Sequence, residues 1–286
     1  MYALEIKGLT KHYKDSNFKL NEINLVVPKG SIVGLVGKNG AGKSSIINSV
    51  FDIVNKDSGE ILFYGQQLTD KNKKLKNEIG VVFDTLSYSG EMTVKKLEKV
   101  LKDLYEAFDS AMFHQYIECF ELPKDKKFKT FSRGMTMKLS IAVAISHGAK
   151  LLILDEATAG LDPVMREGIL DIFLEFVSDE TRAVMLSSHI SSDLEKVADY
   201  IAVIDEGKVI LTEEKDNLLY KYAIAKMKEK DFEKLSKEEY IAYRKRGLQI
   251  EVLVADKTVF SRSYPQVVID QATIDEILPL ITKEAI

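Results

Sequence analysis

The sequence predicts an α/β fold in which a mostly parallel sheet is covered by helices, and two observations support this prediction. Short apolar runs without polar alternation recur along the chain, which is typical of strands buried on both faces. Helical patterns separate these runs, and such alternation favours parallel strands joined by helical crossovers. The predicted buried strands span residues 31–36, 79–83, 151–154, 183–186 and 200–204.

Composition places the chain among ordinary globular proteins. Its 286 residues suffice for one large domain or two modest ones, and 45% of them are apolar and 29% charged. Since 40 basic residues face 44 acidic ones, the formal charge is −4 and broad electrostatic binding to nucleic acid is not expected. We expect a cytoplasmic protein, because no run is long enough to span a membrane, Met1–Leu9 lacks a signal pattern, and Cys119 is the single cysteine.

Two regions flank or interrupt the predicted parallel sheet. Near the N-terminus, apolar residues at Leu4, Ile6 and Leu9 and from residue 18 to 27 predict strands, which Pro28-Lys29-Gly30 closes with a turn. Between residues 91 and 148, apolar side chains recur at helical spacing, which predicts a helical insertion.

The last part of the chain has a pattern of its own. Past Lys215 a charged stretch runs to Gly247, and apolar residues then alternate from Leu248 to Val254, which predicts a small appended module. Its final segment carries Thr273 and Glu276 in the spacing of a capping box, and we expect Pro279 to kink or shorten that helix.

A glycine-rich loop follows the first predicted buried strand. Residues 37–44 fit the pattern G-x-x-x-x-G-K-[ST] and precede a predicted helix over residues 44–50. Backbone N–H groups and the helix N-terminus at such a place create a positive anion site, which glycines let phosphates approach closely. Lys43 would reach the β- and γ-phosphates, and Ser44 would bind Mg²⁺. The alternative is that this segment is a glycine-rich turn with a surface lysine and has no binding function. The loop residues predicted to bind a nucleotide are Gly37, Asn39, Gly40, Ala41, Gly42, Lys43, Ser44 and Ser45.

A second chemical element ends the apolar strand at residues 151–154. Asp155 and Glu156 follow it, at the strand end where an open α/β sheet places its ligands. Asp155 would hold Mg²⁺ directly or through water, and Glu156 would polarise the attacking water. The alternative is a strand that exits into solvent with acidic residues.

The glycine-rich loop and the acidic strand end indicate a nucleotide-binding protein but not which class of such proteins. The run from Phe131 to Met135 indicates the class. It reads F-S-R-G-M and lies at the end of the helical insertion, where the sequence resembles the ATP-binding cassette (ABC) ATPases with their L-S-G-G-Q signature. The resemblance extends over residues 1–214. It includes residues 159–163, which are similar to the family's D-loop, His189 in the place of its switch histidine, and Tyr13 where the family stacks an aromatic ring on adenine.

The resemblance implies a P-loop NTPase (RecA-like) core with an antiparallel β subdomain and a helical subdomain at about residues 88–148. Residues 1–214 would form the nucleotide-binding domain, and residues 215–286 a small α+β accessory extension. The resemblance also implies catalytic roles for Lys43, Glu156 and His189, and contacts from Ser132, Gly134 and Asp162 to the nucleotide of an opposite subunit.

Single residues keep simpler alternatives. Tyr13 could pack a sheet edge, His189 could be an ordinary polar residue, and Asp162 could cap the helix that begins at Pro163 as well as meet a partner.

Three residues depart from the family pattern. Arg133 stands where the family usually has glycine, and Met135 replaces its glutamine. Asp84 occupies the place of the Q-loop glutamine, which contacts the metal and the water. The shorter, charged Asp84 would bind Mg²⁺ through water or cap the next loop. Hydrolysis is still expected, although its rate is left open by these substitutions.

The resemblance therefore implies an ATP hydrolase that dimerises around Mg-ATP, with a second copy or with a related subunit. Its load would be a separate polytopic membrane permease, docked between the core and the helical insertion near residues 84–92. The chain would then lie in the cytoplasm, peripheral to the inner face of the membrane. Among transport ATPases, the sequence looks most like Gram-positive exporters of peptides or antibiotics.

Two other classes compete with this prediction. Soluble ABC ATPases act on DNA or ribosomes, and the basic run at residues 71–76 is the only hint of nucleic acid, although it suits a solvated loop equally well. A P-loop kinase of small molecules would have no use for residues 131–135 or for His189. No nucleic-acid partner is therefore expected.

Overall fold

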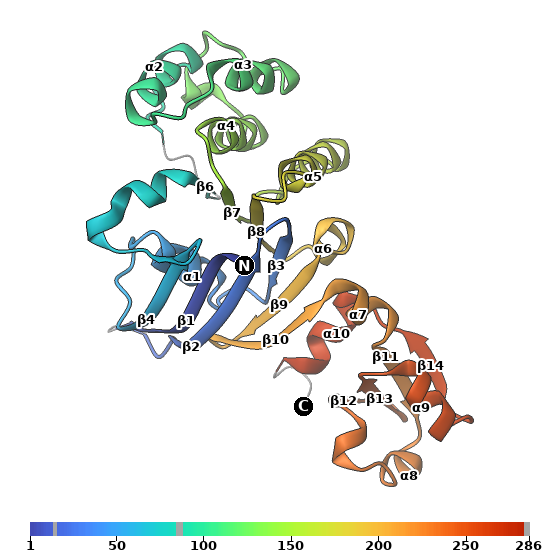
Figure 1. The fold of residues 1–286 in the computed structure, drawn as a ribbon. Helices are drawn as coiled ribbons and strands as arrows, with labels where there is room; N and C mark the ends of the chain where they lie inside the picture. Colours follow the sequence, from blue (N-terminus) through green and yellow to red (C-terminus); the bar gives the residue numbers. More distant parts are fainter. Residues whose placement is uncertain (14–15, 84–87, 283–286) are drawn as a thin grey trace.

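The computed structural model describes residues 1–13, 16–83 and 88–282, which form three β-sheets together with helices (Figure 1). The first sheet is antiparallel, with the order β2-β1-β4-β5. Its strands are β1 (Tyr2–His12), β2 (Lys19–Pro28), β4 (Ser58–Phe63) and β5 (Gln66–Gln67). The predicted N-terminal strands are thus confirmed, and their apolar residues Leu4, Ile6 and Leu9 are buried.

The second sheet has six strands in the order β10-β9-β3-β8-β7-β6. Its strands are β3 (Ile32–Val36), β6 (Ile79–Val82), β7 (Leu151–Asp155), β8 (Ala183–Ser188), β9 (Tyr200–Asp205) and β10 (Lys208–Glu214). The pairs among β3, β6, β7, β8 and β9 are parallel, and only β10 pairs antiparallel, which confirms the predicted mostly parallel sheet. Val36 lies opposite Ser188, and Asp155 opposite Ser187, so that the loops after β3, β7 and β8 emerge side by side.

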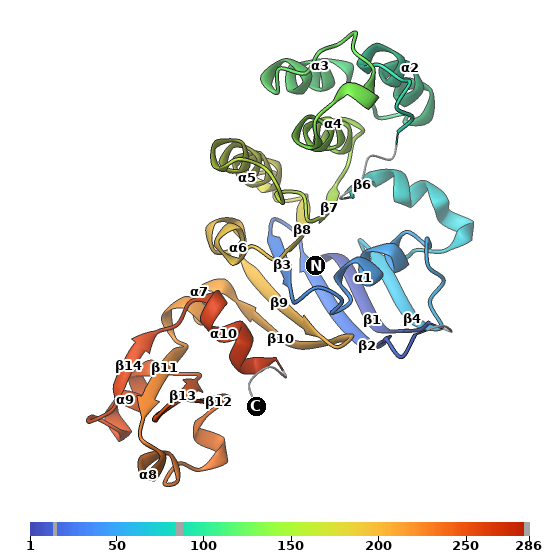
Figure 2. The same cartoon turned by 180° about the vertical axis from the view of Figure 1, so that it is seen from behind.

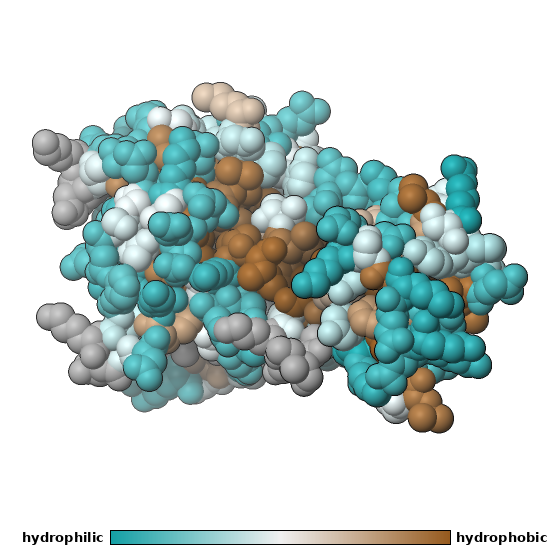
Figure 3. Space-filling model, turned by 90° about the horizontal axis from the view of Figure 1, so that it is seen from below, coloured by the Kyte–Doolittle hydropathy of each residue, from teal (hydrophilic) through white to brown (hydrophobic). Residues whose placement is uncertain are grey.

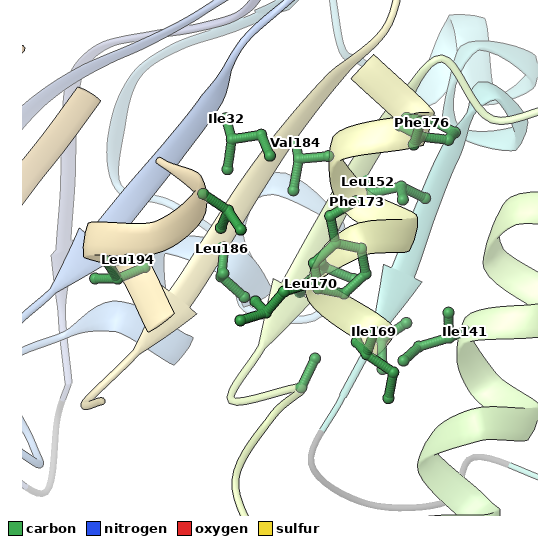
Figure 4. Close-up of a cluster of buried hydrophobic side chains, with 14 of the residues drawn as sticks. Ile32, Ile141, Leu152, Ile169, Leu170, Phe173, Phe176, Val184, Leu186 and Leu194 are labelled. Carbon is green, nitrogen blue, oxygen red and sulfur yellow. The ribbon is translucent and has the colours of Figure 1, made fainter. Parts of the chain in front are cut away.

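Helices and the first sheet cover both faces of this second sheet. Helix α1 (Lys43–Val50) and the antiparallel sheet share one apolar cluster with it. On the other face lie α5 (Pro163–Val177) and α6 (Ser191–Val197). Figure 4 shows Leu170 and Phe173 of α5 directed at Leu186 and Leu152 of the sheet. Each such side chain contributes about 1.5–3 kcal/mol relative to an exposed position.

The helical insertion stands at the upper end of the molecule in Figure 1. It contains α2 (Val94–Leu104), α3 (Ser110–Cys119), the 3₁₀ turn η2 (Phe128–Thr130) and α4 (Arg133–Ser146), and another 3₁₀ segment, η1 (Asp70–Glu78), precedes β6. Helix α4 approaches β6 so closely that a Cβ on Gly80 would lie 2.6 Å from the carbonyl oxygen of Ala144. This contact seats the end of the insertion on the edge of the parallel sheet.

The C-terminal module is a third, four-stranded sheet with the order β12-β13-β11-β14. Its elements are β11 (Ala223–Met227), α8 (Glu229–Phe232), η3 (Lys237–Glu239), β12 (Ala242–Arg246), β13 (Gln249–Val254), α9 (Lys257–Ser263), β14 (Val268–Gln271) and α10 (Ile274–Ile281), and α7 (Lys215–Tyr220) leads into it. Helix α10 lies between this sheet and the core (Figure 2), where the Ile274 N–H donates to Glu195 Oε1 at 2.9 Å. Hydrophobic side chains gather on the surface where the two parts meet (Figure 3).

The structure adds one strand to this module that was not predicted, and one expectation about the module was wrong in detail. The charged stretch contains β11, a central strand whose short run of apolar residues is buried. Leu248 does not belong to the buried alternation, because it lies in the β12–β13 turn and is 96% exposed. The capping box of Thr273 and Glu276 is confirmed, and the helix that contains Pro279 ends after eight residues.

Candidate functional site

The glycine-rich loop follows β3 and leads into α1 without a side-chain cap. Gly42 is the N-cap of α1, with φ at 120°, and the first turn carries no acidic residue. A Cβ at Gly42 would lie 2.9 Å from the Leu20 side chain and 3.0 Å from the Phe18 ring, so the position requires glycine for space as well as for conformation. Among the described residues, no side chain caps the N-terminal N–H groups of α1, which favours an anion there.

A cavity of 390 Å³ opens over this loop. Its wall consists of Phe18, Asn39, Gly40, Gly42, Lys43, Ser44, Ser45 and Glu156. The sequence-predicted residues Gly37 and Ala41 belong to the same loop but do not line the cavity.

Lys43 is the central cation of the cavity. Its side chain is 7% exposed, and Nζ donates to the carbonyl oxygen of Gly37 at 2.6 Å. The same nitrogen lies 3.7 Å from Glu156 Oε1, so the loop and the end of β7 meet at this ammonium. A buried cation beside backbone N–H groups is suited to binding phosphate oxygens.

Glu156 and His189 form a pair at the ends of β7 and β8. His189 Nδ1 lies 2.5 Å from Glu156 Oε2, and the Glu156 N–H donates to the Ser187 carbonyl at 3.0 Å. Glu156 has a φ of 54°, a left-handed conformation that is uncommon for a residue with a side chain and that is found at functional sites. The structure thus brings Lys43, Glu156 and His189 together, as the sequence predicted.

Asp155 meets the requirements of a magnesium ligand. Its side chain is buried, and Oδ1 has no hydrogen-bond partner among the residues that the structure describes. Ser44 lines the adjacent cavity, so the available donors are carboxylate and hydroxyl oxygens, which Mg²⁺ prefers. Within the described part of the chain, no three His, Cys, Asp or Glu side chains are grouped to hold a metal by themselves. A metal here would therefore share its coordination with water or nucleotide oxygens.

Two aromatic rings stand beside the cavity. The Tyr13 and Phe18 ring centroids are 5.9 Å apart, and Phe18 lines both the first cavity and a neighbouring one of 460 Å³. Lys19, Lys38 and Lys208 also line the second cavity. In the sequence, Phe18 belongs to an apolar pattern that predicts a strand, and nothing in that pattern indicates that a residue just before β2 faces a cavity.

The other predicted nucleotide contacts lie away from the cavity wall. Ser132 caps α4 by accepting from the Met135 N–H at 3.2 Å, and Asp162 caps α5 by accepting from the Met165 N–H at 3.0 Å. The cap interpretation of Asp162 is thus confirmed. Gly134 lies against Leu161, so these two helix starts form one surface.

The departures from the signature pattern lie on or near that surface. A Cβ on Gly160 would be 3.4 Å from Arg133 Nη1, so the arginine lies against the loop that precedes α5. Asp84, predicted as a metal and nucleotide ligand, lies outside the described residues.

Comparisons with known proteins identify the class that this fold and site define. Residues 20–159 match the family described as ABC transporter. The bacitracin transport ATP-binding protein BcrA of Enterococcus faecalis is 34% identical over 214 residues, which cover 73% of this chain and 68% of that protein. The lantibiotic transport ATP-binding protein SrtF of Streptococcus pyogenes is 36% identical over 214 residues, which cover 74% of this chain and 91% of SrtF.

A solved structure agrees with these sequence relatives. The structure of the ATP-binding subunit of an ABC transporter has a TM-score of 0.69 and 26% sequence identity, and the match covers 76% of this chain and 91% of that one. The chain therefore belongs to the ABC transporter family, as one of its ATP-binding, ATP-hydrolysing subunits. None of the helices in the described residues has the length and apolar character needed to cross a membrane.

Proposed function

We propose that this chain hydrolyses ATP at a site shared between two subunits and thereby drives a separate membrane permease that exports peptides or antibiotics. The observation that carries the proposal is that Lys43 and Glu156 line the cavity over the glycine-rich loop and that His189 contacts Glu156 beside it. Residues 1–214 would be the nucleotide-binding domain and residues 215–286 an accessory extension.

Residues in and beside the cavity have chemical tasks in this proposal. Lys43 and the free N–H groups of α1 bind the triphosphate, while Glu156 accepts a proton from the attacking water. His189 holds the Glu156 carboxylate through its Nδ1 contact and presents its other ring nitrogen to the γ-phosphate. Bound Mg²⁺, held by Ser44 and Asp155 and through water by Asp84, would supply charge stabilisation to the phosphate oxygens. Tyr13 and Phe18 supply an aromatic surface for adenine.

The proposal of a shared site rests on the position of the surface formed by Ser132, Gly134 and Asp162 at the starts of α4 and α5. Ser132, Gly134 and Asp162 line no part of the cavity of their own chain, while the capped starts of α4 and α5 leave Ser132 and Asp162 exposed. A second subunit, either another copy or a related ATPase, would place this surface over the cavity and complete the site.

The permease would dock at the junction of the helical insertion and the parallel sheet. Residues 84–92, which follow β6, would form much of this contact, and the structure describes residues 88–92 of that segment. The cargo class follows from the relatives, whose names include bacitracin and lantibiotic transport. A subunit that docks in this way lies in the cytoplasm, on the inner face of the membrane.

The Glu156→Gln variant tests the proposed site directly. Because the amide cannot accept the proton of the attacking water, we expect ATP binding to persist while turnover falls by roughly 10²-fold or more. Calorimetry with Mg-ATP and a steady-state phosphate-release assay measure the two quantities. Size-exclusion chromatography with Mg-ATP should also show the variant held as a dimer.

Lys43→Ala serves as the contrasting variant, because it removes a phosphate-binding cation and should weaken ATP binding itself. Near-normal turnover of Glu156→Gln would refute the assigned base, and unchanged ATP affinity of Lys43→Ala would refute the phosphate loop.

A further inference from the structure

An arginine and an aspartate connect the two loops that carry Glu156 and His189. Arg166 lies in the first turn of α5, just beyond the loop that follows Glu156. Asp193 lies in the first turn of α6, just beyond His189. Arg166 therefore lies within the first helical turn after the loop that follows Glu156, and Asp193 lies within the first helical turn after His189.

The geometry joins these two segments at one guanidinium. Arg166 Nη2 donates to the carbonyl oxygen of Leu161 at 3.3 Å, which holds the loop before α5. Arg166 Nε faces Asp193 Oδ2 at 4.0 Å, across the gap between α5 and α6. The Asp193 side chain is 3% exposed and that of Arg166 is 27% exposed, so the pair lies mostly out of water.

The loop between Glu156 and Arg166 is short and internally bonded. The Ala159 N–H donates to the carbonyl of Glu156 at 3.0 Å, and the Leu161 N–H donates to that of Thr158 at 3.4 Å. A shift of the Leu161 carbonyl is therefore transmitted through two turns to Glu156. On the other side, the Asp193 N–H bonds to the carbonyl of Ile190 at 3.2 Å, next to His189.

Packing alone does not explain why charge is placed here. Arg166 Nε and Asp193 Oδ2 are both buried, and neither has a hydrogen-bond partner among the described residues, which is an unfavourable state for ionic groups. Apolar contacts already seat both helices on the sheet, since Leu170 of α5 and Leu194 of α6 belong to the same buried cluster (Figure 4). A charge pair that stability does not require at this position points to a role in positioning.

We infer that Arg166 and Asp193 are positioning residues, which set the geometry of Glu156 relative to His189 by tying the loop before α5 to the start of α6. This inference rests on the proposed function, because it takes Glu156 and His189 as the catalytic pair. Neither Arg166 nor Asp193 lines the cavity over the glycine-rich loop, so both act through other residues.

Charge-neutral variants of similar size test the inference on the full chain. Because only alignment for the chemical step is disturbed, Arg166→Met and Asp193→Asn should each lower kcat by about 10- to 100-fold and leave the KM for ATP within about threefold. The kcat of the double variant should be no lower than that of the less active single variant, because both substitutions break the same contact. Thermal unfolding of each variant shows whether the folded state persists.

The chain provides a matched control on the same two helices. Glu167 of α5 and Lys196 of α6 form an exposed ion pair at 3.3 Å, and Glu167→Gln with Lys196→Met should leave kcat unchanged. Three results would each overturn the inference. They are a kcat loss in the double variant that equals the product of the two single losses, an unchanged kcat in the single variants, or an equal loss of kcat in the Glu167–Lys196 control. If Glu156→Gln is slow while Arg166→Met is normal, only the positioning role fails. If Glu156→Gln is itself normal, the proposed function fails.

Discussion

Helix α1 begins at the proposed nucleotide site in one way, and helices α4 and α5 begin in another. Gly42 starts α1 without a side-chain acceptor, and the N–H groups of that helix belong to the wall of their own cavity. Ser132 and Asp162 start α4 and α5 with side-chain caps, on a surface outside that cavity. A helix start without a side-chain cap leaves its first N–H groups to water or an anion, whereas a capped start has one of these groups satisfied by its own side chain.

The difference divides the proposed site into two halves. The inward half contains the loop, Lys43 and the Glu156–His189 pair, and its cation and N–H groups are suited to binding phosphate oxygens. The outward half has capping bonds of its own, and in the proposed function it would face another subunit. The predictions that follow, from the largest expected effect to the smallest, test whether these halves are separate in function.

The largest effect is expected when variants of the two halves are mixed. Lys43→Ala disables the inward half and Ser132→Ala the outward half, so each variant alone should be inactive. A mixed dimer of two copies keeps one intact site, which joins the Lys43 of one chain to the Ser132 of the other. Since half of the dimers in an equimolar mixture are mixed, ATPase activity should recover to about a quarter of that of the unmodified chain.

The matched control uses two variants of the same half. A mixture of Lys43→Ala with Glu156→Gln should recover nothing, because every inward half remains damaged. Equal recovery in both mixtures, or recovery in neither, would show that the two halves do not meet between copies of this chain.

A smaller effect separates the two tasks of Asp162. The variant Asp162→Ala removes the acceptor of the Met165 N–H and should lower the free energy of unfolding by about 1 kcal/mol. Asp162→Asn retains a capping oxygen and should unfold like the unmodified chain, as denaturant titration would show. A lower ATPase rate in Asp162→Asn at unchanged stability would assign the charge to the nucleotide contact. Equal destabilisation by both variants would contradict the capping argument.

The smallest effect concerns His147, at the end of α4, the helix that carries the outward half. Burial lowers the pKa of His147 below its ordinary value of 6.5, and its ring stacks on Tyr105 at 4.4 Å. Because the unfolded chain binds this proton more readily, the stability that the neutral ring provides is complete above pH 6.5 and is lost as pH falls through the lowered pKa. The free energy of unfolding should therefore drop less between pH 7 and pH 5 in His147→Asn. Parallel pH dependences of the two proteins would exclude this role.

The sequence predicted the parts of this structure that depend on local pattern. Continuous apolar runs predicted the parallel strands, and the glycine spacing predicted the loop, because strand burial and a phosphate-binding turn each require particular residues in a fixed order. The acidic strand end was expected beside the phosphate loop, and Lys43 does lie near Glu156, because the carboxyl ends of β3 and β7 are at one edge of the sheet with only β8 between them.

Features that depend on contacts between distant segments could not be predicted in this way. Phe18 reads as a strand residue until the fold places it beside the glycine-rich loop. Nothing in the sequence singles out Arg166 and Asp193, because only the packing of α5 against α6 brings them together, mostly out of water. In the C-terminal module, β11 was obscured by the charged residues on either side of its short apolar core.

The hydroxyl group that caps α4 can accept one hydrogen bond and donate another at the same time. Ser132 uses a lone pair of Oγ to accept from the Met135 N–H, and its own hydrogen remains available for a donor bond to an incoming anion. A carboxylate would close the helix equally well and yet repel a phosphate, so capping strength and anion affinity diverge at this position. With a serine at this position, the hydrogen bond from the Met135 N–H to Ser132 Oγ can persist when an anion binds to the same hydroxyl.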